Sequence, residues 1–257
     1  MSNKRDRDSV KNIIIVAFSV CLVCAIIVSA AAVSLRPLQQ ENAELDRKQN
    51  VLQAAGIFRS GVSIEEQFAD IETRVIDLNS GEFVDHLDPD TYNQRQAARD
   101  PQRSEAIPGR EDIAGINRRE DYSLVYLVRD DNDDLEILIL PVRAYGLWST
   151  MYGFLALESD LNTVAGLGFY DHAETPGLGG EIDNPNWVAQ WPGRKIYDDD
   201  GEVALRVTRS GNIPEEHHVD GLSGATLTSR GVDNMIEFWM GERGFKPFLE
   251  RLQAEES

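Results

Sequence analysis

Residues Asp220 to Ser229 read D-G-L-S-G-A-T-L-T-S. A periodic apolar run follows them, at the i, i+3, i+4, i+7 and i+8 spacing of one helix face: Val232, Met235, Ile236, Trp239 and Met240. Gly244 is expected to stop this amphipathic helix. Thr226 is therefore predicted at or just before a helix N-terminus, where free backbone N–H groups and the positive dipole end favour an anionic group such as a phosphate.

The residues of this stretch are compatible with such a role. Gly221 and Gly224 let the backbone approach a bulky group and adopt positive φ. Ser223, Thr226 and Thr228 offer hydroxyls, and Ala225 adds little bulk. A loop and helix cap that is merely rich in small residues is the alternative interpretation.

The beginning of the chain has the features of a membrane anchor. No charged residue occurs from Ile13 to Leu35, and a run of this length can cross a hydrocarbon core of roughly 30 Å. We therefore predict a transmembrane helix over residues 12–35 and, from the four basic residues before it, a cytoplasmic N-terminus over residues 1–11. A cleavable signal peptide ending near Ala30–Ala32 is the alternative, although the apolar run exceeds the roughly 7–15 residues of a signal-peptide core.

Acidic residues dominate the rest of the chain. The whole sequence has 25 basic and 44 acidic residues, a formal net charge of −19, and the part after residue 36 holds 20 basic and 42 acidic residues. Such a surface repels nucleic acid and anionic lipid headgroups. We therefore expect no nucleic-acid partner and a well-solvated domain.

No metal site is predicted. The only cysteines, Cys21 and Cys24, lie in the apolar run, where thiols are usually small apolar side chains, although their C-x-x-C spacing leaves a site shared between protein chains open. The acidic run Asp130–Asp134 lacks the glycine and distal glutamate of a calcium-binding EF-hand loop, so we expect a solvated turn.

The pattern after the anchor predicts an α+β domain with a largely antiparallel, twisted sheet flanked by helices. We expect a helical and irregular membrane-proximal region over residues 36–121 and the main domain over residues 122–257. In the first region, a polar helix runs from Leu38 to Ile57, and a capping box of Ser63 and Glu66 opens a helix that ends near Asn79. Residues 85–119 carry no assignable pattern. Strands are expected at residues 124–128, 135–140, 153–158, 164–170 and 203–207.

A second candidate segment runs from His172 to Gly180, after a predicted strand. Its Thr-Pro-Gly-Leu-Gly sequence predicts a tight turn whose exposed N–H groups can hydrogen-bond the edge of a flat ring, unless it is an ordinary strand-to-loop turn. Trp148 could stack on such a ring or belong to the core. We expect packing or interface roles for Trp187 and Trp191, and exposure to solvent for His217-His218.

These segments, in this order, resemble the C subunit of the sodium-translocating NADH:quinone reductases. The stretch from Asp220 to Thr226 is similar to the motif at which a flavin transferase attaches FMN to a threonine. The H-x-E-T-P-G-L-G and S-G-A-T-x-T-S strings are shared with the G subunit of the related Rnf complex. The segments Gly146–Ser149 and Asn184–Trp187, together with the chain length, favour the C subunit.

The resemblance implies a covalent electron carrier. Thr226 would bear FMN as a phosphoester, installed from FAD by a magnesium-dependent flavin transferase. The FMN-binding domain, residues 122–257, would lie in the periplasm of a bacterial inner membrane, within a six-subunit complex that couples electron transfer to outward sodium pumping. The implied cofactor-binding residues are Trp148, His172, Glu174, Thr175, Gly177, Leu178, Gly179, Asp220, Ser223, Gly224, Ala225, Thr226 and Thr228.

No catalytic acid, base or nucleophile is predicted, because an electron carrier needs none for bond cleavage. No G-x-G-x-x-G motif occurs, so we expect no site that binds NADH directly. The resemblance implies that NADH oxidation and quinone reduction take place on other subunits. Two alternatives stay open: the G subunit of an Rnf-type ferredoxin:NAD complex, and a membrane-anchored scaffold domain without flavin. The redox potential, the electron donor and acceptor, the quinone and any sodium contact do not follow from the sequence.

Overall fold

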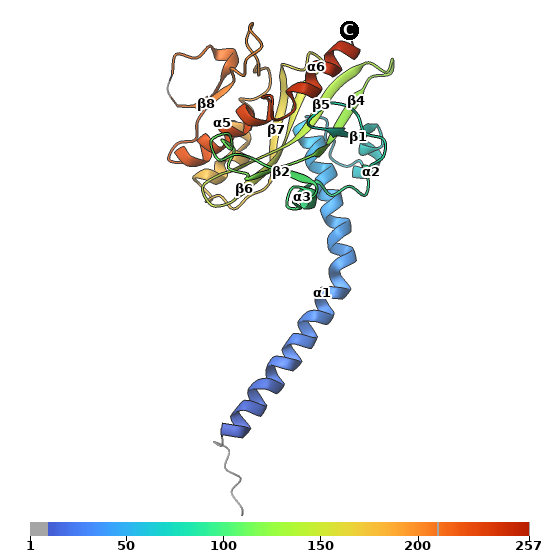
Figure 1. The fold of residues 1–257 in the computed structure, drawn as a ribbon, viewed down its shortest axis with the longest axis vertical. Helices are drawn as coiled ribbons and strands as arrows, with labels where there is room; N and C mark the ends of the chain where they lie inside the picture. Colours follow the sequence, from blue (N-terminus) through green and yellow to red (C-terminus); the bar gives the residue numbers. More distant parts are fainter. Residues whose placement is uncertain (1–9, 210, 257) are drawn as a thin grey trace, which may run out of the picture. The chain divides into compact units, whose positions relative to one another are not determined.

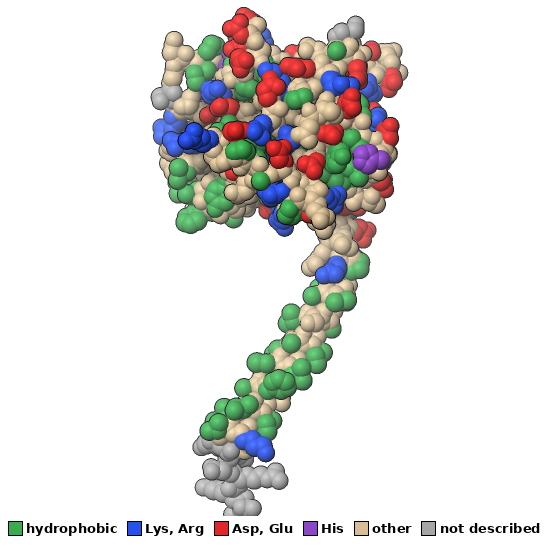
Figure 2. All heavy atoms as spheres, viewed as in Figure 1, with side chains coloured by type: hydrophobic (Ala, Val, Ile, Leu, Met, Phe, Trp, Pro, Cys, Tyr) green, Lys and Arg blue, Asp and Glu red, His purple; other side chains and the backbone are tan. Residues whose placement is uncertain are grey.

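The computed structural model describes residues 10–209 and 211–256, and the chain divides into two compact units, residues 1–46 and 47–257. The described part of the first unit is the long helix α1 (Val10–Ala54), which contains Pro37 and continues into the second unit. An 18-residue window of α1 has a mean hydropathy of 3.0, and none of it is buried. By length and composition α1 can cross a membrane, and Figure 2 shows hydrophobic side chains along it. The helices expected at 12–35 and from Leu38 form one helix.

A five-stranded antiparallel sheet organises the second unit, in the order β1-β4-β5-β6-β7. Its strands are β1 (Ile71–Asp77), β4 (Tyr122–Arg129), β5 (Leu135–Tyr145), β6 (Thr150–Glu158) and β7 (Val164–Asp171). The predicted hairpin around the acidic turn is confirmed as β4–β5, and the strands expected at 153–158 and 164–170 are confirmed as β6 and β7. The α+β architecture is as predicted.

Both faces of the sheet are buried, because other elements pack on each of them. Successive side chains of a strand point to opposite faces, so alternate residues join different clusters. Leu138 and Leu140 of β5 join a cluster with α5 (Thr226–Trp239) and α6 (Lys246–Glu255), which Figure 1 shows lying across the sheet. Ile137 and Ile139 join a second cluster with the last turn of α1, α2 (Ile64–Phe68) and α3 (Gln94–Ala97). This double burial explains the nearly continuous apolar runs of β4 and β5.

The helix expected from Ser63 to Asn79 is wrong in its second half. Ser63 does cap α2 through the N–H of Glu66, but α2 ends at Phe68 and the chain continues as β1. Strand β1 contains three buried β-branched residues, Ile71, Val75 and Ile76, and it pairs over its whole length with β4. The free edge of β4 and the β-branched side chains outweigh the helical spacing.

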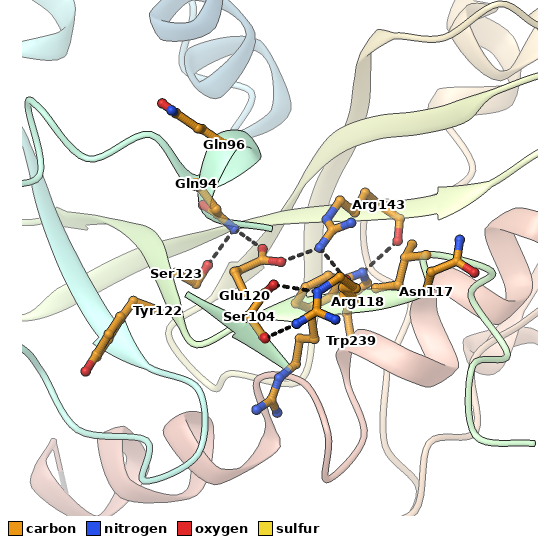
Figure 3. Close-up of polar contacts among 12 residues, drawn as sticks. Gln94, Gln96, Ser104, Asn117, Arg118, Glu120, Tyr122, Ser123, Arg143 and Trp239 are labelled. Carbon is orange, nitrogen blue, oxygen red and sulfur yellow. Dashed lines mark hydrogen bonds and ion pairs between the residues drawn. The ribbon is translucent and has the colours of Figure 1, made fainter. Parts of the chain in front are cut away.

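A buried polar cluster fastens the segment at residues 85–119 to the sheet (Figure 3). Glu120 is fully buried and forms an ion pair with Arg143, and Gln94 donates to it at 2.6 Å. Gln94 also donates to the hydroxyl of Ser123 at 2.9 Å, and the indole N–H of Trp239 donates to the carbonyl of Arg143 at 2.7 Å. At the end of the segment, β2 (Ser104–Ala106) pairs with β3 (Arg118–Glu120). Polar side chains therefore order this region together with scattered buried apolar residues, among them Tyr92, Ile107 and Ile116.

The chain between β7 and α5 is built from short elements: η1 (Gly179–Asp183), α4 (Pro185–Val188), β8 (Arg206–Thr208), η2 (Glu215–His217) and β9 (His218–Asp220). The strand expected at 203–207 is shorter and begins three residues later, as β8, which pairs in parallel with β9. The expected exposure of His217 is wrong, because its ring is buried and contacts the carbonyl of Lys195 at 2.8 Å. Trp187 and Trp191 pack in the core, as predicted. Helix α5 ends at Trp239 rather than near Gly244.

Candidate functional site

Three segments meet where β5 and β7 end. Residues 146–149 form the turn between β5 and β6, residues 172–178 form the loop after β7, and α5 begins at Thr226. Tyr145 pairs with Thr150 and Tyr152 with Asp171, so the turn and the loop lie at the same end of the sheet, beside the first residues of β6. A Cβ atom at Gly231 of α5 would lie 2.6 Å from the carbonyl oxygen of Tyr145, so α5 passes directly against the end of β5.

The carboxylate of Glu174 joins these three segments. Its Oε1 accepts hydrogen bonds from the backbone N–H groups of Leu147 at 3.0 Å and Trp148 at 2.9 Å. Its Oε2 accepts from the hydroxyl of Thr228, on the first turn of α5, at 2.5 Å. Glu174 is only 5% exposed. The loop after β7 therefore holds both the β5–β6 turn and α5 through one buried side chain.

Further hydrogen bonds fix the loop around Glu174. The backbone N–H of Glu174 donates to Nδ1 of His172 at 3.1 Å, and Nε2 of His172 lies 2.7 Å from Asp183. This arrangement fits a neutral ring with its proton on Nε2, donated to the Asp183 carboxylate. The indole N–H of Trp148 donates to Thr175 at 3.0 Å. His172 and Thr175 thus hold the loop and the turn in one arrangement.

The stretch from Asp220 to Ser229 is held by its own backbone and by the core. The N–H of Leu222 donates to the hydroxyl of Ser229 at 2.8 Å, and that hydroxyl donates to the carbonyl of Ala225 at 3.0 Å. Gly224 has φ +76°, a conformation that favours glycine. Trp187 donates to the carbonyl of Asp220 at 2.7 Å. The side chain of Asp220 is exposed.

The start of α5 is open to solvent. Ala225 is its N-cap residue and has no side chain that could accept from the first N–H groups. Thr226 is the first residue of the helix and is exposed, as are Ser223 and Gly224. The prediction that Thr226 lies at a helix N-terminus is confirmed. An exposed hydroxyl therefore stands beside backbone donors that no side chain caps.

Exposed apolar side chains gather in the same three segments. Trp148 is 63% exposed, Leu227 52% and Leu178 46%, and Leu147 is also exposed. Leu178 lies next to the turn before α5, because a Cβ atom at Gly224 would be 3.1 Å from its Cδ2. Large apolar side chains at adjoining loops indicate a surface that covers a ligand or a partner. The alternative that Trp148 belongs to the core is wrong.

The structure brings most of the predicted residues together and separates them by burial. Trp148, Thr175, Leu178 and Thr226 are exposed in the three segments that meet here, whereas Glu174, Gly179, Ala225 and Thr228 are buried. Gly177 has positive φ, and no atom lies near the position of a Cβ on it. The hydroxyl of Ser149 accepts from the N–H of Ala173 at 2.8 Å, and Oε1 of Gln190 accepts from the N–H of Asp220 at 3.0 Å. Sequence reasoning missed these two contributions and those of Leu147, Leu227 and Ser229. Leu227 carried a signal, because it is an apolar residue outside the periodic apolar face of α5.

Comparison with known proteins identifies the family. The model of the FMN-binding domain family matches residues 146–241, which include all three segments. The C subunit of the Na(+)-translocating NADH-quinone reductase of Pseudomonas aeruginosa is 50% identical, over 98% of this chain and 99% of its own. The chain belongs to the C-subunit family of Na(+)-translocating NADH-quinone reductases. The C subunit of Vibrio alginolyticus is 46% identical over 98% of both chains.

Solved structures of this family agree in fold. The crystal structure of Shewanella oneidensis NqrC is 36% identical and has a TM-score of 0.76, covering 83% of this chain and 99% of that one. The C-subunit structure from Parabacteroides distasonis is 27% identical, with a TM-score of 0.66 over 84% of this chain and 96% of the other. The fold of the C subunit therefore extends over most of the chain.

Proposed function

We propose that this protein carries electrons on an FMN that is esterified through its phosphate to Thr226. The observation that supports this most directly is the position of Thr226: an exposed hydroxyl on the first residue of α5, beside an N-terminus that lacks a side-chain cap. Free N–H groups and the helix dipole favour a phosphate at that place. The family match to an FMN-binding domain covers the same residues.

The residues around Thr226 fit the cofactor. A phosphate on the hydroxyl would face the uncapped first turn, and an isoalloxazine would find the exposed faces of Trp148, Leu178 and Leu227. FMN supplies the electron-accepting and electron-donating chemistry when it is bound. The chain itself binds, orients and shields: the apolar side chains exclude water from the ring, and the hydrogen bond between Thr175 and Trp148 fixes the indole plane.

The covalent link is installed, in this proposal, by a magnesium-dependent flavin transferase. The hydroxyl of Thr226 would lose its proton and attack the FMN phosphorus of FAD, a bond would form between Oγ1 and that phosphorus, and the bond from the phosphorus to the bridging oxygen would break, so that AMP leaves. The reaction needs an accessible hydroxyl, and Thr226 meets this condition whereas Thr228 is only 1% exposed.

The membrane arrangement belongs to the same proposal. The basic N-terminus would be cytoplasmic, α1 would span the inner membrane, and the acidic second unit would lie in the periplasm. Within a six-subunit complex, NADH oxidation and quinone reduction would take place on other subunits, and electron flow would drive sodium outward. The names of the relatives, and their match to nearly the whole chain, favour this complex over an Rnf-type one.

The deciding experiment is co-expression with an active flavin transferase, followed by denaturing electrophoresis and peptide mass spectrometry. We expect flavin fluorescence on the protein band and an FMN-phosphoryl group on Thr226. Thr226→Val should abolish it, and Thr228→Val should keep the flavin on Thr226. A band without flavin, with the transferase active on a control substrate, would leave the scaffold interpretation in its place.

Orientation has its own test. Alkaline phosphatase fused after residue 257 folds only in the periplasm, so an active fusion on a full-length, membrane-bound chain supports the proposed topology. A shortened, soluble product would instead show that the N-terminal segment is a cleaved signal.

A further inference from the structure

Glu174 is a buried carboxylate without a cation. Its three hydrogen bonds come from the backbone N–H groups of Leu147 and Trp148 and from the hydroxyl of Thr228. No ion pair joins it to any residue in ranges 10–209 and 211–256. Three donors and no acceptor around it are the pattern of an ionised carboxylate. Burying a charge against neutral donors is costly. An uncharged side chain would join the same segments at a lower cost, so a purely structural role does not explain the glutamate.

The backbone at two glycines packs directly against the carboxylate of Glu174. A Cβ atom at Gly146 would lie 2.5 Å from Oε1, and one at Gly179 would lie 2.7 Å from Oε2 and 2.5 Å from the hydroxyl of Thr228. The backbone therefore packs against both oxygens. Glu174 is only 5% exposed, so it acts on the surface at which the flavin would lie by holding Trp148 and Thr228 and through the field of its charge, and not by direct contact.

We propose that Glu174 is the positioning residue of the flavin site, whose buried charge joins the β5–β6 turn to α5 and lowers the midpoint potential of the flavin above it. The proposal rests on the proposed function for its second half only. Its first half concerns the protein alone: the turn that presents Trp148 and the helix that presents Thr226 are held in register by one carboxylate.

The electrostatic half follows from Coulomb's law in a poorly solvated site. Reduction adds negative charge to the cofactor, and a fixed negative charge beneath it disfavours that change. The same side chain fixes the hydroxyl of Thr228 as a donor to Oε2. The single proton of that hydroxyl is then not free to bond the phosphate on Thr226, so the phosphate depends on the backbone donors of α5.

Glu174→Gln separates charge from shape. The amide oxygen can accept from Leu147 and Trp148, and the amide N–H₂ can donate to Thr228, so the clamp is kept while the charge is lost. Glu174→Ala removes both, and Thr228→Val removes one donor without changing side-chain size. Glu136→Gln is the matched control, because Glu136 is exposed on β5 nine residues before Tyr145, about 30 Å away along the strand.

The first measurement is hydrogen exchange on the full-length protein in detergent, produced without the transferase. In Glu174→Ala, the amides of residues 146–149 should exchange roughly tenfold faster than in wild type, the effect of losing a hydrogen bond. Glu174→Gln and Glu136→Gln should keep the wild-type rate. Equal exchange in Glu174→Ala and wild type would overturn the clamp, and Thr228→Val provides the same test, at residues 226–230, if the alanine variant fails to fold.

The second measurement is the midpoint potential of the flavinylated full-length protein by spectroelectrochemical titration. Glu174→Gln should have a higher potential than wild type, and Glu136→Gln should match wild type. An unchanged or lower potential in Glu174→Gln would overturn the electrostatic half. A wild-type protein that takes up no flavin would instead refute the proposed function, while the exchange data would still decide whether Glu174 clamps the site.

Discussion

Thr226 and Thr228 stand two positions apart at the start of α5, and their surroundings are opposite. Thr226 is exposed, whereas Thr228 is buried and donates its hydroxyl proton to Glu174 at 2.5 Å. Two positions correspond to about 200° around a helix, so the two side chains point to opposite sides. Burial and hydrogen bonding therefore distinguish two threonines that the sequence string presents as equivalent.

The first prediction concerns the hydroxyl of Thr226. Thr226→Ser keeps an exposed hydroxyl at the same helix position and should retain covalent flavin, at a reduced yield. Thr226→Val has the same shape as threonine without the hydroxyl and should carry none. In-gel flavin fluorescence normalised to protein measures both. Retention of covalent flavin by Thr226→Val would place the attachment on another residue.

The second prediction concerns the turn before α5. Gly224→Ala places a Cβ on a residue with φ +76°, 3.1 Å from Cδ2 of Leu178. Left-handed backbone at alanine costs about 1–2 kcal/mol, and the contact displaces an apolar side chain of the site. Gly193→Ala is the matched control, because Gly193 has φ +81° and no atom within 4 Å of that Cβ. Both variants should lose similar stability in thermal unfolding, and only Gly224→Ala should lose flavin yield. Equal yields would show that Leu178 has no part in the site.

Much of the fold could be predicted from the sequence, because strongly patterned segments specify their own structure. The long uncharged run gives the helix of the anchor, and the apolar strands around the acidic turn give the β4–β5 hairpin. The predictions fail where contacts between distant parts of the chain determine the secondary structure. Residues 71–77 have a spacing compatible with a helix, but the free edge of β4 recruits them as a strand.

The candidate site was predictable as a set of motifs and not as an arrangement. Glu174 and its partner Thr228 are 54 positions apart in the chain, and the role of Glu174 depends on which groups donate to it. Periodicity gives no information on a carboxylate that bonds backbone N–H groups of a distant turn. Leu147 became a site residue only through its exposure beside Trp148.

The third prediction concerns pH and Asp233, on α5. Burial raises the pKa of Asp233. It outweighs the hydrogen bond that the N–H of Val207 donates to Asp233 at 2.7 Å, which lowers that pKa. A raised folded-state pKa means that the folded protein binds this proton more tightly than the unfolded chain, so stability falls as pH rises through the unfolded and then the folded pKa. Asp233→Asn keeps an oxygen for Val207 and removes the charge. It should raise the melting temperature at neutral pH, by an amount that shrinks as the pH falls toward the unfolded pKa.

Asp130 is the control for that prediction, with the opposite sign. Hydrogen bonds from the backbone N–H groups of Asp134 and Asn132 lower its pKa. Its charged form is therefore favoured by folding, and the stability it contributes is present above the unfolded pKa and lost as pH falls through the folded pKa. Asp130→Asn should lower the melting temperature at neutral pH and have no effect in strong acid. Parallel pH profiles for the two variants would contradict both assignments.

The fourth prediction concerns the support that Trp187 gives to the stretch before α5. Its indole N–H donates to the carbonyl of Asp220 at 2.7 Å, whereas the buried indole N–H of Trp191 has no hydrogen-bond partner among the described residues. Trp187→Phe and Trp191→Phe both replace an indole of the same core with a smaller phenyl ring. Only the first breaks a hydrogen bond, worth about 1 kcal/mol. Hydrogen exchange over residues 220–226 should rise in Trp187→Phe and stay at the wild-type rate in Trp191→Phe. The flavin yield should fall in Trp187→Phe and stay at the wild-type level in Trp191→Phe, since a less ordered segment 220–226 presents Thr226 less well to the transferase. Equal exchange in the two variants would mean that the stretch is held by its own hydrogen bonds, those of Leu222 and Ser229, and not by the tryptophan beneath it.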